Sequence, residues 1–389
     1  MSPGTLGGEE PVVDVVVAVH SELRPVERAV ASALTGKVPV RVTVVCHELD
    51  PGIVDARLRD VRRSLAGSPH SMWLVCFTDG VPSPAGPFNH GLDCAQAPFV
   101  ALMGSDDVLE PGAIDSWVRR QRLTGADVVI PRLRHGSLGA PGAPPGPGPT
   151  VPTPPVRPLP RRRLDLVRDR LAYRSAPLGL LRRETVERLG LTMTAGMTVG
   201  EDTWFGLGLW SGADVVAYDR RGPAYVIGAD AADRVTFTVK PVAEELACVQ
   251  DAVARPAIEA LPRAARRAVA AKLTRINLFS AVHNRGTDHA WTQRDLEGLR
   301  AVAVALAGFA PGYERVLSVA ERDLLDALRA PTPQGDDAVA QRGAQLVILS
   351  ARRRRHGTPA TLRTRDLRAL LAREAPLRLM TASVLTSRL

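Results

Sequence analysis

Short runs of β-branched residues limit the folds open to this chain more than any other feature of its sequence. The first run, residues 12–19, reads VVDVVVAV, and residues 40–46 form a second. Such runs are typical of strands that are buried on both faces of a parallel sheet. Further strands are predicted at residues 72–77, 99–103, 127–130 and 214–218.

Helical segments separate these strands. Pro25 opens a predicted helix whose apolar side chains share one face, and residues 54–65, 91–97 and 184–189 also have helical patterns. Strands that alternate with helices imply right-handed crossovers between parallel strands. The predicted fold class is therefore α/β, with a mostly parallel, Rossmann-like sheet between layers of helices.

Composition divides the chain into regions. Residues 1–10 are rich in Gly and Glu and are predicted to be flexible, and residues 11–238 contain all the predicted strands. Within this domain, residues 136–160 are dominated by Gly and Pro and are predicted to form an irregular loop insertion. From residue 239 to residue 389 the pattern is helical and ends in a basic tail.

Two adjacent acids follow the apolar strand at residues 99–103. Asp106 and Asp107 come directly after Gly104 and Ser105, where the carboxyl end of a parallel strand opens to a cleft. Adjacent carboxylates repel each other unless a cation lies between them, and oxygen ligands suit Mg²⁺ or Mn²⁺ shared with nucleotide phosphates. The alternative is that the pair caps a helix beginning near Pro111.

A second acidic pair, Glu201 and Asp202, stands at the predicted start of a helix. The helix dipole stabilises carboxylates at this position, and a general base needs an ionised carboxylate. Here too the alternative is simple capping of the helix. Trp204, in the first turn, is a candidate platform for an acceptor, although most helix tryptophans belong to the core.

Three blocks of sequence follow one another in a recognisable order. They are residues 15–34, residues 89–109 with the segment GSDD at 104–107, and residues 176–203 with the segment GEDT at 200–203. Together they resemble the family 2 inverting glycosyltransferases with the GT-A fold, and the likeness spans residues 12–236. The resemblance implies a bacterial enzyme with a GT-A domain and a helical C-terminal extension.

The resemblance also implies a role for each acid. Asp106 would be the second acid of the family's DxD motif and bind the divalent metal, Mn²⁺ or Mg²⁺, on the donor diphosphate, with Asp107 supporting it. Asp202 would take the proton from the acceptor hydroxyl, and Glu201 would orient the acceptor. Attack opposite the leaving nucleotide would invert the anomeric centre of the sugar without a covalent intermediate.

Further donor-binding residues are predicted around these acids. They are Ser105 beside Asp106, His20 at the end of the first strand, Asn89, and Arg234, which would reach the diphosphate. Three of them have a plainer alternative. His20 would be an ordinary loop histidine, Asn89 a cap of the following helix, and Arg234 a solvated arginine.

The chain departs from the family pattern at several positions that contact the donor. Gly104 stands where the family usually has an acid, Ala18 and Ser21 replace the usual Pro and Asn, and residues 46–50 replace the acidic stretch that reads the nucleobase. A UDP-sugar is still the first expectation for the donor. Because of these departures, a different nucleotide sugar is an alternative donor.

Charge and hydropathy suggest partners. The net charge of +9 predicts attraction to polyanions, but no zinc-ligand spacing or aromatic-interleaved basic patch supports a nucleic-acid partner.

Neither a signal-peptide pattern nor an apolar stretch of about 18 residues is present, so we expect a cytoplasmic protein. The basic run at 351–356 and the later Arg/Leu alternation predict contact with the inner face of the plasma membrane. The alternatives are a solvated face or a homo-oligomer contact through the C-terminal helices.

The sequence therefore predicts a metal-dependent inverting glycosyltransferase of the hexosyltransferase type. It would move a sugar from a nucleotide-sugar donor to a hydroxyl of a cell-surface glycan, a polyol-phosphate polymer or a lipid-linked acceptor. One alternative is a degenerate GT-A-fold binding or scaffold protein, which the absence of an acid at Gly104 favours. The other is a nucleotidyltransferase, which would normally carry a glycine-rich phosphate loop that is not found near the first strand.

Overall fold

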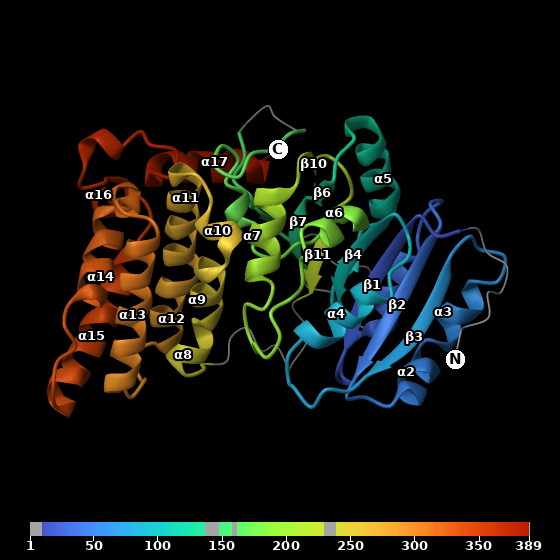
Figure 1. The fold of residues 1–389 in the computed structure, drawn as a ribbon, viewed down its shortest axis with the longest axis horizontal. Coiled ribbons are helices and arrows are strands. Elements are labelled where there is room, and N and C mark those ends of the chain that lie inside the picture. The colour runs from blue at the N-terminus through green and yellow to red at the C-terminus, as the bar shows by residue number, and fades with distance from the viewer. Residues whose placement is uncertain (1–9, 137–147, 158–161, 229–238, 389) are drawn as a thin grey trace.

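The computed structural model describes residues 10–136, 148–157, 162–228 and 239–388. An α/β half, coloured blue to green, lies beside a helical half, coloured yellow to red (Figure 1). The α/β half is built on a seven-stranded sheet with the order β10-β6-β9-β4-β1-β2-β3. The strands are β1 Val13–Val19, β2 Val40–His47, β3 Ser71–Phe77, β4 Phe99–Gly104, β6 Val128–Pro131, β9 Leu180–Arg182 and β10 Val216–Asp219.

All pairings in this sheet are parallel except those of β9, which runs antiparallel to β4 and β6. The strands β1, β2, β6 and β10 are buried on both faces almost throughout, whereas the edge strand β3 is mostly half-buried. In β1, Val15 and Val17 pack into one apolar cluster, whereas Val16 packs into another on the opposite face. The predicted α/β class with a mostly parallel sheet is confirmed.

The helices of this half are α1 Val26–Ala33, α2 Pro51–Arg57, α3 Arg59–Ser64, α4 Ala85–Asp93, α5 Ala113–Thr124, α6 Arg183–Arg188 and α7 Thr203–Gly212. The helix predicted at residues 54–65 is interrupted at Leu58 and forms two short helices. The helix predicted at residues 91–97 begins six residues earlier, at Ala85, and ends at Asp93. Pro87 lies in its first turn, where a proline is tolerated because the missing N–H would have no helical partner.

A second, smaller sheet was not predicted. It has the order β5-β11-β7-β8 and consists of β5 Val108–Leu109, β7 Leu133–Gly136, β8 Thr150–Val151 and β11 Tyr225–Gly228. Strand β8 lies within residues 136–160, so the expectation of a wholly irregular insertion is wrong at this point. The sheet pairs β11 with β5, which follows the acids after β4 directly.

The helical half confirms the predicted character of the C-terminal third. Its helices are α8 Val242–Glu245, α9 Ala247–Ala254, α10 Pro256–Glu259, α11 Arg263–Leu273, α12 Phe279–Arg285, α13 Gln293–Phe309, α14 Val319–Arg329, α15 Asp336–Arg353, α16 Pro359–Leu362 and α17 Pro376–Arg388. A π-helical segment, Thr274–Leu278, joins α11 to α12. None of the helices in the described ranges has the length and hydropathy needed to span a bilayer.

The two halves share one apolar core. A single cluster of buried side chains includes Val16 of β1 and Leu346 of α15. Polar contacts add to it, since Arg170 donates to the carbonyl oxygen of Arg373 at 2.6 Å and Arg220 donates to that of Leu385 at 3.2 Å. Helix α17 runs back from the helical half toward the α/β half (Figure 1). Residues of the helical half can therefore take part in a site on the α/β half.

Candidate functional site

The carboxyl ends of β1, β2, β3 and β4 meet at one edge of the large sheet because these strands are parallel. Ala18 of β1 pairs with Gly104 of β4, so His20 and Asp106 follow adjacent strand ends. His20 is exposed there, whereas Ser105 and Asp106 are buried. The structure thus brings these three predicted donor-binding residues to the same edge.

Asp106 is surrounded by arginines from the segment after β1. Arg24 forms an ion pair with the Asp106 carboxylate at 2.9 Å, and both side chains are buried. Arg28, in α1, also approaches, with its Nη2 at 3.5 Å from the backbone oxygen of Asp106. Two guanidinium groups beside a carboxylate make this edge suitable for an anionic ligand such as a diphosphate.

Asp107 is held by the small sheet. The hydroxyl of Tyr225 donates to Oδ2 of Asp107 at 2.5 Å, and the N–H of Gly228 donates to Oδ1 at 2.8 Å. Burial and the neighbouring Asp106 raise the pKa of Asp107 to about 6, against the lowering effect of these hydrogen bonds. Asp107 therefore fixes β11 against the end of β4, and its role as a metal ligand stays a prediction.

The helix-capping alternative for this acidic pair is wrong, because α5 follows Gly112 at its N-cap and has no side-chain cap. The absence of a side chain at Gly104 has a structural reason. A Cβ atom at this position would lie 2.7 Å from Oδ2 of Asp107. The Asp107 carboxylate thus occupies the space beside the position where the family usually has an acid. Tyr225, which sequence reasoning missed, also accepts a hydrogen bond from the Gly104 N–H at 3.2 Å.

Glu201 and Asp202 precede α7. Asp202 stands at the N-cap position, but its side chain makes no capping hydrogen bond, so the capping alternative is wrong for this carboxylate. Burial raises the pKa of Asp202 to about 6. Burial and repulsion from Asp202 raise the pKa of Glu201 to about 7. A pair of carboxylates with raised pKa values is common at sites of proton transfer.

The turn that carries these two acids is anchored to α4. Asn89 donates through its amide to the carbonyl oxygen of Met193 at 3.0 Å and accepts from the Met193 N–H at 2.8 Å. The hydroxyl of Ser83, just before α4, donates to the carbonyl oxygen of Met197. Ser83 and α4 follow the carboxyl end of β3. These contacts therefore bring the turn with Glu201 and Asp202 to the same sheet edge as Asp106. Asn89 lies inside α4 and is not its cap, and its donor-binding role stays a prediction.

Of the two remaining predicted residues, the structure describes Trp204. The ring of Trp204 is buried in the core, with the Arg255 guanidinium 5.1 Å from its centroid. A buried ring favours the core alternative over an acceptor platform. Arg234 lies outside the described residues, so its predicted contact with the diphosphate stays a prediction.

Sequence reasoning also missed a cluster at the ends of β2 and β3. His47, Glu48 and Asp79 place one potential ligand atom each within 4.8 Å of one another, and within the described ranges they form the group of three such side chains that could hold a metal ion. His47 Nε2 lies 2.9 Å from Asp79 Oδ1, and Glu48 accepts from the backbone N–H groups of Asp79 and Gly80. Imidazole and carboxylate ligands fit a divalent cation such as Mn²⁺. The sequence showed His47 and Glu48 only within the departure from the family pattern at residues 46–50, and it predicted a turn at Asp79.

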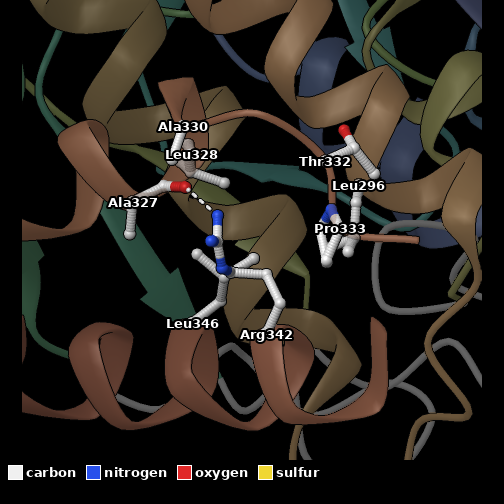
Figure 2. A pocket seen from close by; sticks show the side chains of 8 residues that line it. All are labelled: Leu296, Ala327, Leu328, Ala330, Thr332, Pro333, Arg342 and Leu346. Atoms are coloured by element: carbon white, nitrogen blue, oxygen red, sulfur yellow. Dashed lines mark hydrogen bonds between the residues drawn. The ribbon is translucent and has the colours of Figure 1, made fainter. Parts of the chain in front are cut away.

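Two hollows in the helical half do not involve the predicted site residues. The smaller, of about 10 Å³, lies among α13, α14 and α15, where Arg342 donates to the carbonyl oxygen of Ala327 at 3.1 Å (Figure 2). The larger, of about 380 Å³, lies beside α11 and is lined in part by Arg267, Arg315 and Arg368. The candidate site is therefore defined by its charged side chains at the sheet edge.

Replacing Glu201 by Gln is expected to stabilise the folded protein at alkaline pH. The pKa of Glu201 is about 7 in the folded state and 4.5 ordinarily, so its ionised form destabilises the fold. Wild-type stability should fall as the pH rises from about 4.5 through about 7, whereas the variant does not titrate there. Urea unfolding should give about 1–3 kcal/mol more stability for the variant at pH 8 and no difference near pH 4.5. Equal stabilities at pH 8 would contradict the burial of this charge.

Comparison with known proteins identifies the fold. No protein-family model matches the chain, and no curated protein sequence matches it. Among solved structures, residues 1–349 of S. aureus TarS superpose with a TM-score of 0.64 at 15% identity, covering 89% of this chain and 93% of that one. The same fragment in complex with UDP-GlcNAc gives a TM-score of 0.63 at 13% identity. The predicted GT-A fold is confirmed by this likeness.

The likeness covers part of the longer neighbour. Against the TarS chain of the structure not limited to residues 1–349, the TM-score is 0.63 at 14% identity, and the match covers 86% of this chain but 55% of that one. At such identities the likeness concerns the fold.

Proposed function

We propose that the protein is an inverting glycosyltransferase that moves a sugar from a nucleotide-sugar donor to a hydroxyl acceptor. The observation that carries this proposal is Asp202, a half-buried carboxylate at the N-cap position of α7 that makes no capping hydrogen bond and whose pKa is raised to about 6. At neutral pH it would be ionised and able to accept a proton. On a GT-A fold with Asp106 and two arginines at the same sheet edge, it supplies the base for inverting transfer.

The donor would bind with its diphosphate near Asp106. Arg24 and Arg28 would counter the phosphate charge, and His20 and Ser105 would line the nucleotide. A divalent cation, Mn²⁺ or Mg²⁺, held by Asp106 or by the group of His47, Glu48 and Asp79, would neutralise charge on the departing nucleotide diphosphate. UDP-GlcNAc is the first donor to try, because it is bound to the structural neighbour TarS.

The acceptor and its location belong to the proposal as well. A cell-surface glycan, a polyol-phosphate polymer or a lipid-linked acceptor would be glycosylated on the cytoplasmic side. The end of the chain exposes apolar side chains among arginines, including Leu367, Leu371 and Leu377. Such a surface supports contact with anionic lipid, or association through the C-terminal helices.

A degenerate binding protein is the second candidate, and one observation favours it. Asp106 is paired with Arg24, and both oxygens of Asp107 accept hydrogen bonds within the protein. A protein of this kind would bind a nucleotide sugar without turning it over.

Calorimetry with a panel of nucleotide sugars tests the donor. We expect saturable binding of at least one of them in Mn²⁺ or Mg²⁺, and at least tenfold weaker binding in EDTA or after Asp106→Asn. EDTA removes the cation that would bind the diphosphate, and the substitution removes a carboxylate that would hold this cation. Asp60→Asn, at an exposed position in α3, is the matched control and should bind as the wild type does. Absence of binding to every nucleotide sugar would contradict the proposal, and binding that ignores EDTA would contradict its metal dependence.

A further inference from the structure

A buried lysine from the helical half lies behind the acidic turn. Lys272, near the end of α11, is only 2% exposed. Its ammonium donates to Oδ1 of Asn277 at 3.4 Å, and Asn277 lies in the π-helical segment that follows. Burial of an ammonium is costly unless an anion lies nearby. We therefore expect an anion close to Lys272.

A chain of contacts runs from this lysine to the turn that precedes α7. The Asn277 amide donates to Sγ of Cys248 in α9 at 3.7 Å. Cys248 in turn packs against Gly200, where a Cβ atom would lie 2.6 Å from the sulfur. Gly200 also has a φ of +74°, so a side chain is disfavoured there for two reasons. The helical half is therefore packed directly against the segment that carries Glu201 and Asp202.

Two lysines of the helical half act on the acidic turn. The charge of Lys272 acts on the Asp202 carboxylate and on the Cys248 thiol over more than ion-pair distance. Burial raises the pKa of the thiol, so Cys248 is neutral and Asp202 is the anion of the two. Lys240 forms an ion pair with Glu244 at 3.2 Å, and its charge also acts on Glu201. Lys37, Lys240 and Lys272 are the only lysines among the chain's 50 basic residues.

We propose that Lys272 is a positioning residue: its buried ammonium, packed behind the acidic turn through Asn277 and Cys248, keeps Asp202 ionised, so that the helical half completes the active site. The role in proton abstraction rests on the proposed function. The electrostatic pairing itself does not. A lysine suits this place because its compact charge can be buried at the end of an apolar stem.

The small number of lysines gives a direct test. Protein labelled with ¹³C at the lysine ε-carbon should give three resonances, assigned with Lys37→Met and Lys240→Met, and each can be titrated by NMR. In Asp202→Asn, we expect the pKa of Lys272 to fall by about one unit or more, because the opposite charge is gone, while Lys37 is unchanged. Glu201→Gln is the matched control, and it should affect Lys240 more than Lys272. An unchanged Lys272 titration in Asp202→Asn would overturn the proposal.

The reciprocal variant connects the pairing to activity. In Lys272→Met, the acidic limb of the pH profile for donor turnover should move upward by about one pH unit, and Lys272→Arg should restore it in part. A lysine with a merely structural role would lower activity at all pH values without moving the limb, which would also overturn the proposal. If the wild type turns over no donor, the proposed function fails, and the lysine titration still decides the pairing. If Lys272→Met does not fold, the titration in Asp202→Asn decides the pairing by itself.

Discussion

Asp202→Asn is expected to lower the rate of sugar transfer by about 10²–10⁴-fold. The amide keeps the size and shape of the side chain but cannot accept the proton from the acceptor hydroxyl. The Asp202 side chain is not needed as a helix cap, so the variant should fold normally. Donor affinity should stay within about threefold, because the change removes an interaction made only in the transition state.

The wild-type rate should also depend on pH in one direction. Because the pKa of Asp202 is about 6, activity should fall as the pH drops through about 6, where the base becomes protonated. Asp214→Asn, at an exposed acid just after α7, is the matched control and should keep full activity. Initial rates over a pH series measure both effects. Full activity of Asp202→Asn would show that the base is another group.

Asp14→Ala is expected to lower the free energy of unfolding by about 3–5 kcal/mol. Asp14 in β1 is fully buried and lies opposite Arg41 in β2. Its two oxygens accept from Nε and Nη2 of Arg41 at 2.6 and 2.7 Å, and one of them also accepts from the N–H groups of Gln96 and Ala97. The substitution would leave the buried guanidinium of Arg41 and the N–H groups of Gln96 and Ala97 without their acceptor.

A double-mutant cycle shows how much of this cost belongs to the pair. Removing both charges, with Asp14→Leu and Arg41→Met, should cost less than the sum of the two single changes, because each single change leaves an unpaired charge and the double change leaves none. The exposed pair Asp60 and Arg63 is the control, and its removal should change stability by less than about 1 kcal/mol. Urea unfolding measures all of these values. A loss below about 1 kcal/mol in Asp14→Ala would show that water reaches the site.

The large sheet could be predicted because most of its strands are continuous apolar runs. The small sheet could not, since β5 and β8 are two residues long and carry no periodicity. The start of α4 is predicted too late because Gly86 and Pro87 in its first turn are typical of turns. The pairing of Asp14 with Arg41 was visible in principle, as single charges in two adjacent apolar strands.

The candidate site was predicted from its acids and completed by the structure. Asp106 and Asp202 stand out locally, because each follows a recognisable strand or precedes a helix. Tyr225 and Lys272 could not be placed, since Tyr225 lies 118 residues from Asp107 along the chain and Lys272 has no motif of its own. The scarcity of lysine in an arginine-rich chain was the one available indication for Lys272.

Inversion with Asp202 as the base is tested by ¹H NMR of the sugar anomeric proton during turnover of an α-linked nucleotide sugar by the wild-type protein. We expect the first product, formed with an acceptor or with water, to have the β configuration, and Asp202→Asn to form it at least about 100-fold more slowly. A first product with the α configuration, or no cleavage of any donor that binds, would contradict an inverting transferase.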